Sequence, residues 1–333
     1  MTENQAAMSR RRILPVGEIV NGVFLLDTLA AGTAGFVAAY LVKGEESALI
    51  DAGYPTSAKA VLSQLRELDG RHRNVNYLIP THVHLDHAGA VGHLARAMPN
   101  ARILVSKHGA KHMINPSRLV ESATKAFGQE AMSVFGTPIP VARDRVEPVG
   151  DKYDLDLGAG KKLKIFSTPG HAPHHMSVLL GHEHLLVTGD AVGLRYQGFD
   201  FPIPTTPPPS FDEEQYMRTL TRIIDINPSG LLLPHFGPIL SGAEGFQRKN
   251  VEAVTHWGSK VYDAVKGQQS IDQVFKYLIT DLAEHSGKPE SDLPDHIRRI
   301  VKLSDMGYYS YIEKRIASQS SLTENWTDLI PHG

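Results

Sequence analysis

The sequence predicts an α/β (α+β) protein of four layers, with two mixed β-sheets packed face to face between outer helices and a helical extension at the C-terminal end. Strand-rich and helical segments alternate twice in the first two thirds of the chain. A histidine-rich segment directly follows a buried strand, which is typical of ligands gathered on loops at one edge of the sheets. From Gly242 to Ala317 the pattern is helical, with no alternating strand signal.

The N-terminal part contains short apolar segments separated by glycine-containing or charged turns, a pattern typical of successive strands. After Thr56 or Ser57, either of which can cap a helix, apolar residues recur at helical spacing. The strands expected here are Val20–Leu26, Phe36–Val42, Ala48–Asp51 and Tyr77–Pro80.

The middle of the chain repeats this alternation. We expect helices at Ala88–Met98 and Pro116–Phe135, and strands at Ile103–Val105, Leu163–Thr168, Met176–Leu180 and Leu185–Thr188. Phe199–Pro209 contains five prolines in eleven residues, so it is predicted to be a stiff loop. Asp212 then caps a helix to about Ile226, and Leu231–Leu233 is the last expected strand.

These patterns divide the 333 residues into three parts. Residues 1–17, which include an arginine run, are expected to be a flexible, solvated tail. We expect residues 18–241 to form one domain of strands and helices, and residues 242–333 to form the helical region.

Composition excludes several classes of protein. The formal net charge is −2 and basic residues are spread along the chain, so we expect a small-molecule substrate and no nucleic-acid partner. The chain has no cysteine, which excludes disulfides, thiolate ligands and a cysteine nucleophile, and is consistent with the cytoplasmic location that we expect. The most apolar stretch, Val23–Val42, is interrupted by Asp27, Gly32 and Gly35, so no membrane segment is expected.

The segment Thr81–His87 carries the strongest functional signal. It places three imidazoles and a carboxylate within six residues, immediately after the expected strand. These side chains are His82, His84, Asp86 and His87. Imidazole and carboxylate are ligands for Zn²⁺ and similar ions, and a loop leaving a rigid strand can turn all four side chains toward one point.

Three single residues would complete two coordination shells: His171, Asp190 and His235. Each closely follows an apolar strand. One such residue alone is more often structural, but three at strand ends, in this order, favour metal ligands.

The combined pattern resembles the metallo-β-lactamase superfamily, whose HxHxDH, GH, GD and H motifs are matched by these seven residues. The resemblance extends over roughly residues 18 to 240 and includes Leu49–Gly53, which is similar to the family's early aspartate motif. It implies one metal bound by His82, His84 and His171, a second bound by Asp86, His87 and His235, and Asp190 as the bridge.

Details of the pattern discriminate within the superfamily. The absence of cysteine and the presence of Asp190 disfavour a true β-lactamase, and His84 stands where flavodiiron proteins usually carry an acidic residue. The pattern is most similar to glyoxalase II-like thioesterases, lactonases and phosphodiesterases.

The resemblance therefore implies a hydrolase with two divalent ions, Zn²⁺ first and Fe or Mn as alternatives. A metal-bridging hydroxide would attack a small ester-type substrate, with a thioester expected and a lactone, phosphodiester or phosphotriester as the alternative. Asp190 would hold the metal pair and Asp86 would help to place the proton on the leaving group. A nuclease, an iron redox enzyme and a non-catalytic metal-binding protein remain as other classes.

Other residues have two interpretations each. Asp51 is either a turn residue or a group that orients a ligating histidine, and His175, rather than His174, is favoured as a similar group or a substrate contact. Phe199 and Phe201 either wall an apolar pocket or belong to a rigid connector.

Residues without motif support are expected to be structural or exposed, His112 among them. Tyr308, Tyr309 and Tyr311 are expected in core packing or a subunit interface rather than in substrate contact, and a homodimer is an open alternative.

Overall fold

The structure is a computed structural model that describes residues 17–69, 75–196 and 202–327. The described residues fall into two compact units. Unit 1 lies within Met1–Ser167, His174–Gly189 and Pro228–Ser241, and unit 2 within Thr168–Pro173, Asp190–Asn227 and Gly242–Gly333. Residues 1–16 of the predicted tail, together with Phe199 and Phe201, lie outside the described residues. The domain boundaries drawn from the sequence stay a prediction.

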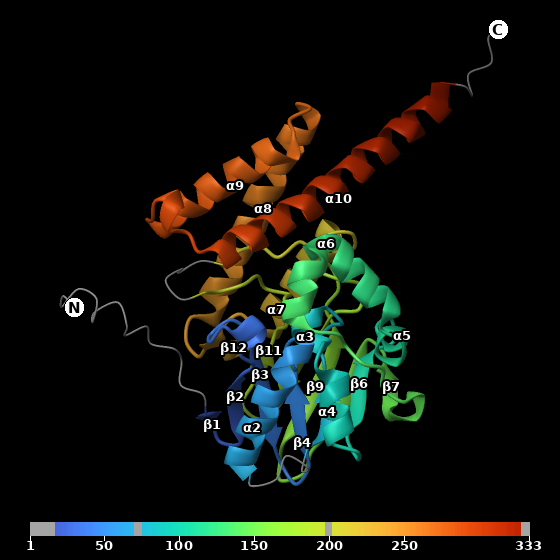
Figure 1. Ribbon diagram of the computed structural model, residues 1–333. Helices are drawn as coiled ribbons and strands as arrows, with labels where there is room; N and C mark the ends of the chain where they lie inside the picture. The colour runs from blue at the N-terminus through green and yellow to red at the C-terminus, as the bar shows by residue number, and fades with distance from the viewer. Residues whose placement is uncertain (1–16, 70–74, 197–201, 328–333) are drawn as a thin grey trace, which may run out of the picture. The chain divides into compact units, whose positions relative to one another are not determined.

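Unit 1 contains two mixed sheets (Figure 1). The first has seven strands in chain order: β1 (Gly17–Val20), β2 (Val23–Asp27), β3 (Ala38–Lys43), β4 (Ser47–Ile50), β5 (Val75–Ile79), β6 (Arg102–Ser106) and β7 (Val146–Val149). The second has six strands in the order β13 (Gly237–Ile239), β12 (Gly230–Leu233), β11 (Leu185–Val187), β10 (Met176–Leu180), β9 (Lys162–Ser167) and β8 (Lys152–Asp156). The pairs β4–β5 and β11–β12 are parallel, so the carboxyl ends of each pair meet at one edge.

Alternation along the strands builds two apolar cores in unit 1. Tyr40 and Val42 of β3 belong to a cluster that includes side chains of both sheets, whereas Leu41 belongs to a cluster with helices on the other face of the first sheet. The helices that supply this second cluster are α2 (Ala58–Asp69), α4 (Val91–Ala97) and α5 (Ala110–Ile114). Unit 1 therefore has the predicted succession of helices, sheet and sheet.

The other helices of unit 1 lie in the connections between strands. They are η1 (Ala30–Gly32), η2 (Pro55–Ser57), α3 (Leu85–Ala88), α6 (Ser117–Phe135) and η4 (Arg143–Arg145). A small third cluster joins η1, η2, α3 and α6, and Tyr54 stacks on Phe135 within it, with ring centroids 4.2 Å apart.

Unit 2 is helical, as predicted for the C-terminal region. Its elements are α7 (Glu213–Ile226), α8 (Ala243–Lys266), α9 (Ile271–Ser286), η5 (Glu290–Asp292) and α10 (Asp295–Thr327), and α10 packs against both α8 and α9 (Figure 1). Asp212 caps α7 by accepting from the Gln215 amide, which confirms the predicted start of that helix. Within the part of the chain that the structure describes, no helix is long and apolar enough to cross a bilayer.

Some predicted elements differ from the structure. Val20–Leu26 was expected to be one strand, but Asn21 and Gly22 form a turn between β1 and β2, and Gly22 has a φ of 74°. The sequence pattern also missed β7, β8 and β13. All three are edge strands: β7 contains Pro148, a residue that usually interrupts strands, β8 is mostly polar, and β13 has only three residues.

Candidate metal centre

Strand ends position the candidate ligands of unit 1. Asp51 directly follows β4, and Thr81–His87 follows the parallel neighbour β5, so these segments leave the first sheet at one edge. His235 lies in the turn between β12 and β13 of the second sheet. The Tyr40 hydroxyl of β3 donates to the Leu233 carbonyl at 2.5 Å, which fastens the first sheet to the end of β12.

Asp51 is a buried carboxylate with three hydrogen-bonding neighbours. It accepts from the Thr81 amide at 2.7 Å and from the Thr81 hydroxyl at 2.9 Å, and its other oxygen lies 3.0 Å from His87 Nδ1. Because an ionised carboxylate can only accept, Nδ1 of His87 carries the proton and Nε2 keeps its lone pair. This is the arrangement that orients an imidazole for metal binding.

His235 is held in the same way by a backbone group. Its Nδ1 lies 3.1 Å from the Phe36 carbonyl oxygen, which can only accept, so Nε2 of His235 is also an acceptor. The two Nε2 atoms of His87 and His235 lie 3.4 Å apart, and Asp86 Oδ2 lies 3.6 Å and 3.4 Å from them.

Asp86, His87 and His235 therefore bring three acceptor atoms together, all within 4.8 Å of one another. Acceptor atoms repel at this spacing unless a cation lies among them, and neutral imidazole with carboxylate is a donor set for zinc-like ions. The residues present thus fit a divalent metal ion.

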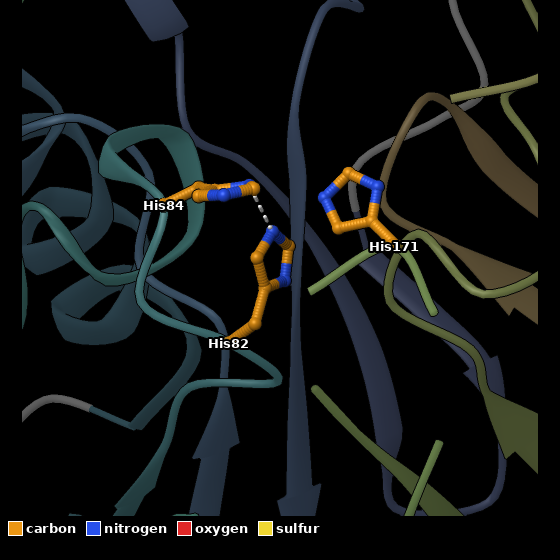
Figure 2. A group of neighbouring side chains, drawn as sticks. All are labelled: His82, His84 and His171. Carbon is orange, nitrogen blue, oxygen red and sulfur yellow. Dashed lines mark hydrogen bonds between the residues drawn. The ribbon is translucent and has the colours of Figure 1, made fainter. Parts of the chain in front are cut away.

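His82 and His84 form a second pair in unit 1. His82 Nε2 lies 2.9 Å from His84 Nδ1, the contact drawn in Figure 2, and the other nitrogen of His82 lies 3.2 Å from the Thr81 hydroxyl. That hydroxyl donates to Asp51, so it accepts from Nδ1 of His82. Nε2 of His82 is then an acceptor, as a metal ligand requires.

Unit 2 repeats the pattern with His171, which Figure 2 also labels, and Asp190. Nδ1 of His171 lies 3.0 Å from the Thr205 carbonyl oxygen, so it is the donor and Nε2 the acceptor. Nε2 lies 3.6 Å from Asp190 Oδ2, and both side chains are buried.

Helix α7 fixes the two loops of unit 2 that carry these residues. Gly170 has a φ of 129°, and a Cβ there would meet the Tyr216 backbone at 2.3 Å. The Tyr216 hydroxyl accepts from the Gly193 amide at 3.0 Å and donates to the Asp190 carbonyl at 3.3 Å. Burial, the largest cause, raises the pKa of Tyr216, so this hydroxyl keeps its proton.

The structure places all seven predicted ligands, five in unit 1 and two in unit 2. Asp51 has the contact to a histidine that the sequence predicted. His175 is buried, its ring lies 4.9 Å from that of His82, and a Cβ on Gly189 would meet its Nε2 at 2.4 Å. His175 thus packs beside a candidate ligand, while its role as an orienting group or substrate contact, the catalytic roles of Asp86 and Asp190 and the metal roles of the ligands stay predictions.

Three contributors were given no role in the sequence analysis. Thr81 links Asp51 to His82, yet it was noted only as part of the motif. In the sequence, Tyr40 is simply one of the apolar residues of an expected strand. Its neighbours in the sequence do not indicate the hydrogen bond from its hydroxyl to the end of β12. His174 was set below His175, but its ring lies 5.7 Å from that of His84.

Comparison with known proteins decides the family. The family model for the Metallo-beta-lactamase superfamily matches residues 32–235. The chain belongs to this superfamily. The match confirms the predicted fold class, and members of this family are mostly metal-dependent hydrolases.

Individual relatives agree with the family. The Metallo-beta-lactamase fold-containing protein ST1585 of Sulfurisphaera tokodaii is 34% identical over 219 residues, which cover 64% of this chain and 78% of that protein. The N-acyl homoserine lactonase AttM of Rhizobium radiobacter is 30% identical over 154 residues, 45% of this chain and 54% of the lactonase. The crystal structure of the metallo-beta-lactamase family protein TTHA1429 from Thermus thermophilus has a TM-score of 0.65 and 21% identity, covers 90% of this chain and 95% of its own, and shows the fold alone.

Proposed function

We propose that this chain is a hydrolase that uses two divalent metal ions, with Zn²⁺ as the first candidate, to cleave a small ester-type substrate. His82, His84 and His171 would hold one ion, Asp86, His87 and His235 the other, and Asp190 would bind both. The observation that carries the proposal is the set of acceptor atoms from Asp86, His87 and His235, all within 4.8 Å of one another.

The chemistry follows from the donor set. When bound, two such ions lower the pKa of a bound water to about 7 and polarise the substrate oxygen. The protein holds the imidazoles in the required tautomer through Asp51, the Phe36 carbonyl and the Thr205 carbonyl.

Asp86 is suited to carry a proton. Its side chain is 23% exposed, whereas the side chain of His87 beside it is fully buried. A carboxylate at the edge of the ligand group can accept a proton from water and return it to the leaving group. No side-chain nucleophile is needed.

Two acyl substrates remain in the proposal. A thioester is the expectation from the motif pattern, whereas the 30% identity to an N-acyl homoserine lactonase favours a lactone. Both place a carbonyl carbon and a leaving oxygen or sulfur at the metal pair, so the same residues would serve either substrate.

The test is a hydrolysis screen on metal-depleted protein reloaded separately with Zn²⁺, Mn²⁺ and Fe²⁺. We expect turnover of an acyl thioester or a lactone above a phosphodiester, with about two ions per chain by elemental analysis. His87→Ala should lose metal and turnover, whereas His182→Ala, which removes an exposed histidine of unit 1, should lose neither.

Metal content and turnover separate the alternatives. One ion or none in fully reloaded protein would refute the two-metal site. Two ions without turnover of any ester would favour a binding protein, and visible absorption after purification would favour iron over colourless zinc.

A further inference from the structure

His174 of unit 1 lies beside two candidate ligands, but its hydrogen bonding differs from that of a metal ligand. Its ring is parallel to that of His82 at 6.2 Å and edge-on to that of His84 at 5.7 Å. Nδ1 of His174 accepts from the Val83 amide at 3.4 Å, so the proton lies on Nε2. His174 therefore presents a hydrogen-bond donor next to the ligand pair, whereas a metal ligand presents an acceptor.

His112 of α5 contacts His174 in turn, on the aromatic ring. Its ring lies 6.4 Å from that of His174, and the side chain is half-buried. Burial lowers the pKa of His112, and the two charges that act on it, Lys111 and Arg118, lower it further. Both of those charges are positive, and both side chains are exposed.

We propose that Lys111, His112 and Arg118 form an anion-binding subsite, joined by His174 to the ligand pair His82–His84. The inference rests on the proposed function and narrows it: the substrate is an ester or thioester that carries a carboxylate or phosphate away from the scissile bond. Lys111 and Arg118 supply the charge, and a ring N–H of His112 supplies directed hydrogen bonding.

The geometry sets where the anionic group lies. His112 is one ring contact from His174, and His174 is one ring contact from His84. A substrate whose reacting carbonyl lies at the metal ligands therefore has to span these two ring contacts, 5.7 Å and 6.4 Å between centroids, to reach the subsite. A neutral substrate of equal length gains nothing from these charges.

The kinetic test compares two thioesters of equal chain length with the metal-loaded full chain: the S-phenyl monothioester of suberate, which is anionic, and S-phenyl thiooctanoate, which is neutral. In Lys111→Gln/Arg118→Gln the ratio of kcat/KM for the anionic over the neutral substrate should fall about tenfold, and by less at high salt. The control is Lys125→Gln/Lys164→Gln, which removes two exposed lysines of unit 1 and the same net charge. An unchanged ratio, or an equal fall in the control, overturns the subsite.

A binding test separates this inference from the proposed function. Succinate and inorganic phosphate are titrated calorimetrically into the metal-free full chain, and the double variant should bind one of them about tenfold more weakly. The anion whose binding is weakened in the double variant shows whether the subsite takes a carboxylate or a phosphate group. If no thioester is hydrolysed but anion binding depends on Lys111 and Arg118, the proposed function fails and the subsite stands; if neither anion's binding changes, the subsite fails.

Discussion

Asp305 in α10 is a buried carboxylate whose replacement should stabilise the protein. Its side chain is fully buried, and neither oxygen has a hydrogen-bond partner among the described residues. The nearest cation, Lys302 Nζ, is 3.9 Å away. Burial, the largest cause, raises the pKa of Asp305 from 3.8 to about 7, and Lys302 offsets only part of that rise.

The direction of the pH effect follows from this raised pKa. Between pH 3.8 and about 7 the folded state binds a proton at Asp305 that the unfolded chain has released, so stability falls as the pH rises. The stabilisation from this proton is complete below pH 3.8 and is lost above pH 7. About three pKa units at about 1.4 kcal/mol each give a cost of up to about 4 kcal/mol at pH 8.

Asp305→Asn removes the charge and keeps the shape. The variant should be more stable than the wild type at pH 8 by up to about 4 kcal/mol, and the two should approach each other below pH 4. Urea unfolding at a series of pH values measures both proteins. The matched control is Asp263→Asn, an exposed position on α8. A stability difference between Asp305→Asn and wild type that stays constant from pH 4 to pH 8 would refute the reasoning.

Substitutions at three further positions test the site and the helical unit. Asp51→Asn removes the acceptor that orients His87, so zinc affinity measured by chelator competition should fall about 10- to 100-fold. Gly189→Ala should cost about 1–3 kcal/mol in urea unfolding, because the φ is 53° and the new Cβ would meet His175. Tyr308→Ala should cost about 3–5 kcal/mol, because this tyrosine is fully buried in unit 2, whereas Tyr308→Phe should cost about 1 kcal/mol for its one hydrogen bond.

Each of these expectations has an outcome that contradicts it. Wild-type zinc affinity in Asp51→Asn would show that the carboxylate does not orient the ligand. Unchanged stability of Gly189→Ala would mean that His175 is not packed against that backbone. A normal free energy of unfolding with an altered KM in Tyr308→Ala would place the tyrosine in substrate contact instead of the core.

The candidate ligands were predictable from the sequence because ligand chemistry restricts residue type and because each residue closely follows an apolar strand. His82, His84, Asp86 and His87 lie within six residues, and the parallel pairing of β4 with β5 brings them to the end of the sheet where Asp51 also lies. The helical region was predictable for a different reason, since the helical repeat of apolar residues continues along it with polar breaks.

The edge strands were less predictable. A strand in the middle of a sheet is covered on both faces and reads as an apolar run, whereas β8 at the edge can be polar and β7 can tolerate Pro148. The β1–β2 turn was not predicted, because apolar side chains lie on both sides of Asn21 and Gly22. The two strands therefore look like one continuous apolar strand in the sequence.

The orientation of the ligands depends on groups that leave little trace in a sequence. His235 and His171 are fixed by the carbonyl oxygens of Phe36 and Thr205, and every residue type has such an oxygen. His87 and His82 are instead fixed by side chains, Asp51 and the Thr81 hydroxyl, so these contacts depend on residue identity. Substitution of Phe36 or Thr205 would keep the acceptor as long as the backbone stays in place, whereas substitution of Asp51 removes it. The sequence therefore predicts the candidate ligands, while the structure is needed to show that four of their imidazoles, those of His82, His87, His171 and His235, have the tautomer that leaves Nε2 available to a metal.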